Sequence, residues 1–339
     1  MKKYTLIAFL IFILSVSACK KDRINEFIDI YTTGYISLPD TIIDGIAVPE
    51  RQVATVWKND SLIILSDTSS EANAIFLQDD NMYVAGHFFP EGATYWINGI
   101  RQNLPTYRGY AAITTDIAAM SNLVYVSGYV ARVSDSIYTA KLWRNGTEEV
   151  LANSTDAVAN AVAINALGDI YVVGWKKIGN TINAVYWKNG QQFILGPGVA
   201  NDIFIVNNTV YIGGHTYNNF GGQRAAYWKN NLISILENDL NSDVVAISFS
   251  DNVVFAAGRT NNDACYWRDG SRFQVQTSDT YNNSINGMAT YGNSAFSAGS
   301  ILINAEQKAY YWENRSKYIL PAGTYDFWSE ANDIAIKEK

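Results

Sequence analysis

The sequence predicts an all-β protein, a seven-bladed β-propeller with four-stranded antiparallel blades. A tryptophan is followed eight residues later by an aliphatic residue seven times, and successive tryptophans lie 39 to 47 residues apart. That period is typical of one propeller blade. The tryptophan and aliphatic pairs are Trp57/Leu65, Trp96/Leu104, Trp143/Leu151, Trp187/Leu195, Trp228/Leu236, Trp267/Val275 and Trp312/Leu320.

Residues 157–196 show the four strands of one repeat most clearly. Four short apolar runs are separated by turn residues, and Asn189-Gly190 lies between the last two. Asn-Gly between two apolar runs is a strong hairpin signal, because both central positions of a type I′ turn need positive φ. Equivalent turns recur at Asn98-Gly99, Asn145-Gly146 and Asp269-Gly270, and no helix is predicted after residue 27.

The second strand of each repeat carries an aromatic residue followed three residues later by glycine. A glycine inside a strand marks a bulge or a close backbone approach. We expect these glycines to let neighbouring sheets converge toward the axis. The seven pairs are Tyr31/Gly34, Tyr83/Gly86, Tyr125/Gly128, Tyr171/Gly174, Tyr211/Gly214, Phe255/Gly258 and Phe296/Gly299.

The two ends of the chain each lack part of a repeat. Residues 331–336 form a first-strand run with no second strand after it, and residues 27–35 form a second-strand run with no first strand before it. We expect the C-terminal strand to pair with the N-terminal strands 27–35, 51–58 and 61–66 and to close the ring. Closure removes exposed sheet edges. Residues 28–339 are thus predicted to be one domain.

The N-terminus has the layout of a secretory signal. Two lysines precede an apolar run over 6–14, and Val16-Ser17-Ala18-Cys19 follows. This ending resembles the lipobox of bacterial lipoproteins, which implies removal of 1–18, lipidation of Cys19 and a tether over 19–27. The resemblance places the protein in the bacterial cell envelope, anchored to the outer membrane and facing the periplasm or the surface. The alternative is an ordinary secretory signal with Cys19 as a stray thiol.

The amino-acid composition limits the kinds of partner that the protein can bind. The formal net charge is -7, opposite to the basic surface that nucleic acid requires, so no nucleic acid partner is expected. The other cysteine, Cys265, lies in an apolar strand segment and is interpreted as a small packed hydrophobe. We expect a monomer without a cofactor.

A ring of candidate ligand-binding residues follows the second-strand glycines. Connections between second and third strands, and between repeats, are long, whereas the other connections are tight hairpins. Binding residues concentrate on loops held by a rigid scaffold, so this loop-rich face is the one to search. Aromatic side chains there suit stacking on sugar rings, although the same residues could simply pack over the rim. The candidates are Tyr35, His87, Tyr129, Trp175, His215 and Arg259, and Ser300 holds the seventh position.

A second ring places Asn or Asp at the start of each innermost strand. Such side chains commonly bond neighbouring backbone groups, and a hydrated or cation-bearing channel mouth is the alternative. Two certain carboxylates are too few for a calcium site, so no metal site is predicted. The ring comprises Asn73, Asp116, Asn160, Asn201, Asp243, Asn286 and Asn332.

At the level of families, the Trp-x-Asn-Gly turn with its leucine, together with the upstream Ala163-Ile164-Asn165 and Val172-x-Gly174 runs, resembles the HAF-type repeats of bacterial extracellular proteins and, more broadly, propeller-repeat lipoproteins. The resemblance spans 28–339 and implies an envelope lipoprotein without a shared catalytic motif. No catalytic residue is predicted.

The sequence therefore favours a lipid-anchored, non-catalytic binding module for a glycan or a protein. A glycan-active hydrolase or lyase is the first alternative, and it requires two carboxylates roughly 5 to 10 Å apart at the channel mouth. A structural scaffold of an envelope complex is the second alternative, and it requires an exposed apolar patch on the outer strands.

Overall fold

The computed structural model describes residues 27–339 apart from several short segments. The segments left out are 44–45, 90–91, 106–109, 133, 135–136, 152–155, 239–240, 262, 276–282 and 323–327. The predicted signal segment 1–18, the tether up to residue 26 and the predicted lipidation site Cys19 lie outside the described residues. Within the described ranges all regular elements are β-strands, numbered β1 to β29.

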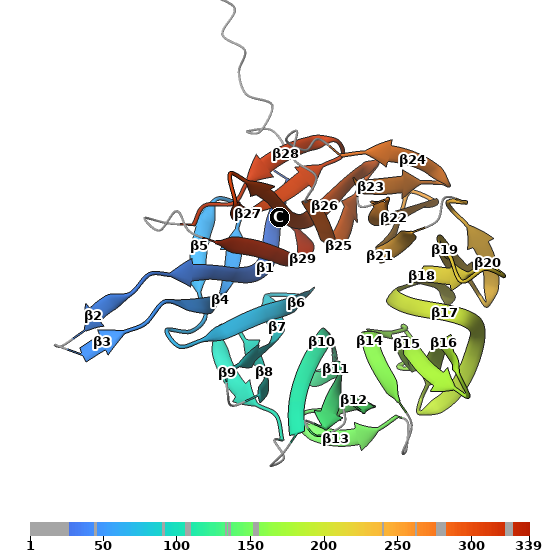
Figure 1. The fold of residues 1–339 in the computed structure, drawn as a ribbon, viewed down its shortest axis with the longest axis horizontal. Helices are drawn as coiled ribbons and strands as arrows, with labels where there is room; N and C mark the ends of the chain where they lie inside the picture. The colour runs from blue at the N-terminus through green and yellow to red at the C-terminus, as the bar shows by residue number, and fades with distance from the viewer. Residues whose placement is uncertain are drawn as a thin grey trace, which may run out of the picture.

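The strands form antiparallel sheets arranged around a common centre, which gives a propeller-type fold (Figure 1). Five sheets have four strands, one has seven and one is a two-stranded hairpin. In the order of pairing, the four-stranded sheets are β29 (Ser329–Glu338), β1 (Ile28–Leu38), β4 (Arg51–Lys58), β5 (Ser61–Ile64); β6 (Ser70–Gln78), β7 (Asn81–Phe88), β8 (Gly92–Ile97), β9 (Ile100–Asn103); β10 (Tyr110–Met120), β11 (Leu123–Arg132), β12 (Tyr138–Arg144), β13 (Thr147–Val150); β21 (Ser242–Ser250), β22 (Val253–Thr260), β23 (Asp263–Arg268), β24 (Ser271–Gln274); and β25 (Asn283–Tyr291), β26 (Ser294–Ile303), β27 (Glu306–Glu313), β28 (Ser316–Ile319).

The seven-stranded sheet is two repeats joined by one long strand. Its strands are β14 (Ala157–Ile164), β15 (Ile170–Ile178), β16 (Thr181–Lys188), β17 (Gln191–Val206), β18 (Thr209–Tyr217), β19 (Gln223–Lys229) and β20 (Leu232–Ile235). The first part of β17 pairs with β16, and its second part pairs with β18. A single strand therefore ends one repeat and begins the next.

The last strand of the chain pairs with the first. β29 runs antiparallel to β1, with Ile30 opposite Ile336 and Gly34 opposite Ala331. The predicted pairing of 331–336 with 28–34 is confirmed. A hydrogen bond also joins the N-terminal and C-terminal parts of the chain: Trp57 Nε1 donates to the Pro321 carbonyl at 2.7 Å.

The repeat tryptophans form the core between neighbouring sheets. All seven are at most 1% exposed. Trp143 of β12, for example, lies in one apolar cluster with Ala85 and Tyr95 of the preceding sheet. Large aromatic side chains contribute most of the buried area in such a core. The repeat tryptophans therefore pack between neighbouring repeats.

The second-strand glycines face a carbonyl of their own sheet. A Cβ built on Gly214 would lie 2.1 Å from the Val199 oxygen, and the other six glycines meet the equivalent oxygen at 1.8 to 2.1 Å. The pairing register shifts at this level in every repeat, as a β-bulge requires. The expectation that these glycines bring neighbouring sheets together is therefore wrong, because the close approach is to the bulged innermost strand of the same sheet.

The predicted hairpin turns have the expected backbone. Asn189 and Gly190 have φ of 49° and 80°, as a type I′ turn needs. The Asn189 side chain also accepts a hydrogen bond from the Ile170 amide at 2.9 Å. The connection between β1 and β4 is not a plain loop, since β1 extends to Leu38 and a projecting hairpin of β2 (Thr41–Ile43) and β3 (Ile46–Val48) follows it (Figure 1).

Candidate functional site

The innermost strands carry a bulge residue at the same level in each repeat. These bulge residues are Asn73, Thr115, Asn160, Asn201, Val245, Asn286 and Asn332. Five of them belong to the predicted Asn and Asp ring. The other two members of that ring, Asp116 and Asp243, are not bulge residues, since Asp116 follows its bulge residue by one position and Asp243 precedes its bulge residue by two. The sequence does not reveal where each bulge falls, and a shift of one residue redirects the side chain.

Six of the seven bulge residues link one repeat to the next. Each donates from its side chain to a backbone carbonyl on the innermost strand of the following repeat, which agrees with the backbone-bonding interpretation of the ring. The bonds are Asn73 to Thr114 (2.6 Å), Thr115 to Ala159 (2.8 Å), Asn160 to Ala200 (2.8 Å), Asn201 to Val244 (2.7 Å), Asn286 to Ala331 (2.9 Å) and Asn332 to Ala72 (3.0 Å).

Three carboxylates lie two residues before the bulge, at the loop-rich mouth of the ring. We call Glu71, Asp243 and Glu330 the mouth acids. Each accepts one hydrogen bond from the side chain of the bulge asparagine of the preceding sheet, in addition to that asparagine's bond to a backbone carbonyl: Asn332 donates to Glu71 at 2.9 Å, Asn201 to Asp243 at 2.9 Å and Asn286 to Glu330 at 3.0 Å. The carboxylates are thereby fixed in orientation.

Three of the candidate ligand-binding residues that follow the second-strand glycines contact the mouth acids. The Tyr35 hydroxyl donates to Glu330 at 3.3 Å, and His215 Nδ1 lies 2.9 Å from Asp243. His87 Nε2 lies 3.7 Å from Glu71. Tyr35, His87 and His215 are buried, at 5 to 7% exposure, so they are not open stacking platforms.

The other three candidate ligand-binding residues, Tyr129, Trp175 and Arg259, do not contact the mouth acids through any hydrogen bond or ion pair described above. Tyr129 and Trp175 are half-buried, and each meets the edge of Tyr138, at 5.3 Å and 6.1 Å between ring centroids. Arg259 is exposed. Tyr138 was not singled out by sequence, because it lies on the third strand, outside the glycine-based pattern.

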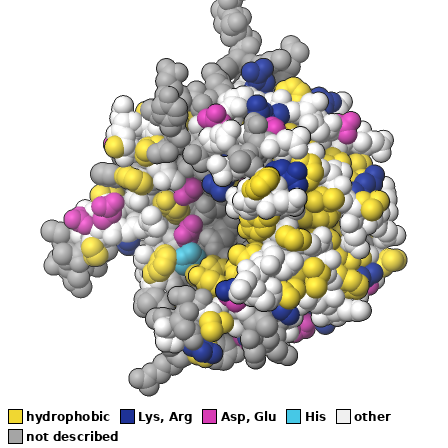
Figure 2. Space-filling view, turned by 45° about the vertical axis from the view of Figure 1, so that its right-hand side comes forward, with side chains coloured by type: hydrophobic (Ala, Val, Ile, Leu, Met, Phe, Trp, Pro, Cys, Tyr) yellow, Lys and Arg dark blue, Asp and Glu magenta, His cyan; other side chains and the backbone are white. Residues whose placement is uncertain are grey.

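Burial and mutual repulsion set the charges at the mouth. Burial raises the pKa of Glu71, and the neighbouring Glu330 carboxylate raises it further. Burial, followed by the charges of Glu330 and Glu71, raises the pKa of Tyr35 so far that its hydroxyl stays protonated and donates. Burial lowers the pKa of His87, which favours its neutral form. Acidic side chains and a histidine gather at the central hollow in Figure 2.

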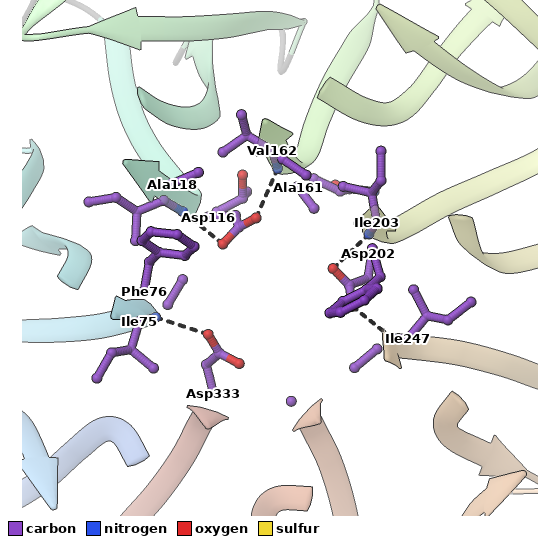
Figure 3. A pocket seen from close by; sticks show the side chains of 18 of the residues that line it. Ile75, Phe76, Asp116, Ala118, Ala161, Val162, Asp202, Ile203, Ile247 and Asp333 are labelled. Carbon is purple, nitrogen blue, oxygen red and sulfur yellow. Dashed lines mark hydrogen bonds between the residues drawn. The ribbon is translucent and has the colours of Figure 1, made fainter. Parts of the chain in front are cut away.

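Below the bulge residues lies a central cavity of about 810 Å³ (Figure 3). All seven innermost strands line it, from the bulge level to the strand ends near Gln78 and Asn165. Those ends adjoin the tight hairpins, so the cavity lies toward the face opposite the predicted binding loops. Most of its wall is aliphatic or aromatic, with Phe76 and Phe204 among the lining residues.

Three aspartates converge on the inner part of this cavity in Figure 3. Asp116, Asp202 and Asp333 each follow a bulge residue directly and occur in alternate repeats. Each carboxylate accepts one hydrogen bond from the amide of the next residue and one from an amide of the following sheet. The cross-sheet donors are Val162 for Asp116 (2.8 Å), Ile247 for Asp202 (2.7 Å) and Ile75 for Asp333 (2.9 Å).

These three carboxyls titrate above the ordinary range. Burial raises the pKa of Asp116 to about 6, although two amide hydrogen bonds oppose the rise. Burial and the charge of Asp116 raise the pKa of Asp202 to about 7. The pKa of Asp333 is also raised well above its usual value, mainly by burial. Asp202 and Asp333 are not among the residues predicted from sequence, and the signal that marks them is their position directly after Asn201 and Asn332.

No metal centre is evident in the described part of the chain, where no three His, Cys, Asp or Glu side chains are grouped to hold an ion. Across the same residues no helix has the length and apolar character needed to span a membrane.

No family model matches the chain, and no curated protein matches it. Solved structures with similar folds include the Pyrococcus horikoshii acylaminoacyl peptidase (TM-score 0.51, 10% identity, 85% of this chain and 52% of that one) and the Kuenenia stuttgartiensis hydrazine synthase (0.48, 10%, 75% and 45%). TolB from Acinetobacter baumannii is similar at a TM-score of 0.38 and 12% identity, covering 70% of this chain and 61% of that one. The chain spans only 38 to 52% of the length of the first three structures it matches. These likenesses concern the propeller-type fold alone.

Proposed function

We propose that this protein is a lipid-anchored envelope protein whose seven-bladed propeller is a non-catalytic binding module for a hydroxyl-rich ligand, a glycan. Counting β17 in both of its repeats gives seven sheets of four strands. The bonds from Asn286 to β29 and from Asn332 to β6 support closure of the ring through β29. Closure leaves no innermost sheet edge unprotected.

The observation that carries the proposal is the fixed set of acceptors at the mouth. Asn201, Asn286 and Asn332 each hold one mouth acid in place from the preceding sheet. Sugar hydroxyls donate hydrogen bonds, and pre-oriented carboxylates accept them without paying further side-chain entropy. The half-buried Tyr129, Tyr138 and Trp175 cluster adds aromatic surface for a sugar face.

A glycan-active enzyme is the second candidate, and the pair Glu71 and Glu330 favours it. The two carboxyls interact electrostatically, and the raised pKa of Glu71 suits a general acid. Binding is preferred because both oxygens of Glu330 already accept hydrogen bonds, from Asn286 and Tyr35. A carboxylate held in this way is a weaker nucleophile or base than a free one.

A structural scaffold is the third candidate, favoured by the outer strand β20. Leu232, Ile233 and Ile235 are 76%, 48% and 38% exposed there. An apolar edge strand of this kind can pair with another chain. Analytical ultracentrifugation of wild type and Ile233→Lys tests this reading, which requires an oligomer that the charge disperses.

Binding to a glycan array tests the leading proposal. Purified wild-type protein is expected to bind a defined set of glycans, and Trp175→Ala and His215→Ala are expected to weaken binding at least about tenfold. Leu167→Ala, at an exposed turn between β14 and β15, serves as the control and should bind as wild type does. Unchanged glycan binding in both Trp175→Ala and His215→Ala would contradict a glycan site at the mouth of the ring.

Mass spectrometry of the bound glycans separates binding from catalysis. We expect wild-type protein to release them intact. Cleaved glycans from wild type, and intact ones from Glu71→Gln and Glu330→Gln, would establish the enzyme instead. Lipid attachment is tested separately by labelling cells with an alkyne fatty acid, where label is expected on wild type and its retention on Cys19→Ser would contradict the anchor.

A further inference from the structure

The central cavity combines an apolar wall with an anionic inner end. The described residues that line it include Asp116, Asp202, Asp243 and Asp333, and no lysine, arginine or histidine is among them. Its volume of about 810 Å³ falls within the range of small-molecule sites. From the bulge residues to the strand ends the wall extends over some five residues, or about 16 Å at the rise of a β-strand. The cavity is therefore a tube with one charged end.

The carboxylates at that end retain acceptor capacity. Each oxygen of Asp202 accepts one backbone amide, from Ile203 or Ile247. A carboxylate has about four lone-pair sites, so each oxygen can accept one more donor. Figure 3 shows the three aspartates facing a shared central space from different strands.

The arrangement favours an organic cation over a bare metal ion. Within the described residues the acidic groups are not clustered closely enough to ligate one ion. A larger cation could approach them while its apolar body contacts Phe76, Ile164 and Phe204, all half-buried along the wall. Aromatic faces also attract organic cations.

We propose that the central cavity binds an amphipathic amine, with its ammonium group among Asp116, Asp202 and Asp333 and its aliphatic chain along the tube. This site lies on the opposite side of the bulge residues from Glu71 and Glu330, and Asp243 is the one mouth acid that also lines the cavity. It goes beyond the glycan site, and the two stand or fall separately.

Calorimetric titration with three probes of equal length tests the proposal: n-octylammonium, 1-octanol and octanoate, at about pH 8, above the pKa of Asp116 and that of Asp202. Octylammonium is expected to bind at least about tenfold more tightly than octanol, the effect of one hydrogen bond to a charged group. Octanoate is expected not to bind. Equal affinity for octylammonium and octanol, or no binding of octylammonium, would overturn the proposal.

Two variants locate the site. Asp202→Asn is expected to reduce the preference for octylammonium, whereas Asp269→Asn, the same change at an exposed turn, should not. Ala163→Phe narrows the tube without altering a carboxylate and is expected to abolish binding of both ligands. Unchanged binding in Ala163→Phe would place the ligand elsewhere and contradict the proposal, even if circular dichroism shows that Asp202→Asn does not fold. Trp175→Ala should bind octylammonium as wild type does.

Discussion

Asp333, on the last strand of the chain, accepts a hydrogen bond from the Ile75 amide at 2.9 Å across 258 residues of sequence. It also accepts the amide of Ile334 at 2.8 Å. Innermost strands have no partner on their inner side, so their amides need other acceptors. One carboxylate satisfies an amide from each of two neighbouring sheets, and Asp116 and Asp202 repeat the arrangement.

The channel carboxyls should make the folded protein more stable in mild acid. The folded pKa of Asp202 is about 7 against an ordinary 3.8, so between these values the folded protein binds more protons than the unfolded chain. The contribution is full below the lower value and is lost as pH rises through the upper one. Urea unfolding is expected to give a larger free energy at about pH 5 than at about pH 8.

Asp202→Asn should reduce that difference by an amount on the order of 2 kcal/mol, since each pKa unit corresponds to about 1.4 kcal/mol. The exposed Asp269→Asn serves as the charge-matched control. The same pH dependence in wild type and Asp202→Asn would show that this carboxyl does not contribute.

A methyl group on Gly214 should be costly although the backbone there is not left-handed. The added Cβ would lie 2.1 Å from the Val199 oxygen, so the bulged strand must move. Gly214→Ala is expected to lower the free energy of unfolding by about 3 kcal/mol. Gly190→Ala is the comparison, because Gly190 has positive φ but open space around it and should lose only about 1 kcal/mol. Equal losses in urea unfolding would contradict the bulge explanation.

Two tryptophans of the same repeat position should respond differently to phenylalanine. Trp57 Nε1 donates to the Pro321 carbonyl at 2.7 Å, whereas Trp187 Nε1 is buried without a partner among the described residues. Trp57→Phe loses a hydrogen bond and leaves a carbonyl unpaired. We expect Trp57→Phe to cost about 1 to 2 kcal/mol more than Trp187→Phe in thermal unfolding. A larger cost for Trp187→Phe would argue against a stabilising hydrogen bond between Trp57 and Pro321.

Cys265 should not react in the folded protein. Its side chain is fully buried, and burial raises the pKa of its thiol to about 11. The thiolate is the reactive form, so a disulfide reagent is expected to label Cys19→Ser protein only after denaturation. Rapid labelling of the native variant would show that β23 opens.

The repeat architecture could be predicted from sequence because its signals depend on one residue type at one phase. Trp143 marks its strand because a large side chain is buried there. Gly128 marks its strand because there is no space for a Cβ at that position. The agreement of strand pairing with prediction at Gly34 and Ala331 follows from the same regularity.

The candidate site could be predicted only in part, since one bulge per innermost strand decides which neighbour faces the channel. Asp116 and Asn160 look equivalent by sequence, yet Thr115 is the true counterpart of Asn160. His215 reaches Asp243 of the next sheet, whereas His87 lies beside Glu71 of its own sheet. Contacts between sheets are not encoded in the spacing of either sequence segment.

The pairing of β29 with β1 is tested most directly by engineered disulfides in a Cys19→Ser, Cys265→Ser background. Tyr31 lies opposite Ala335 and Thr32 opposite Ile334, and in antiparallel strands one of two adjacent pairs is the closely spaced type. We expect at least one of the double variants, Tyr31→Cys with Ala335→Cys or Thr32→Cys with Ile334→Cys, to form an intrachain disulfide under native oxidation, detected by mass spectrometry. Failure of both pairs to link in folded protein would contradict the closed ring.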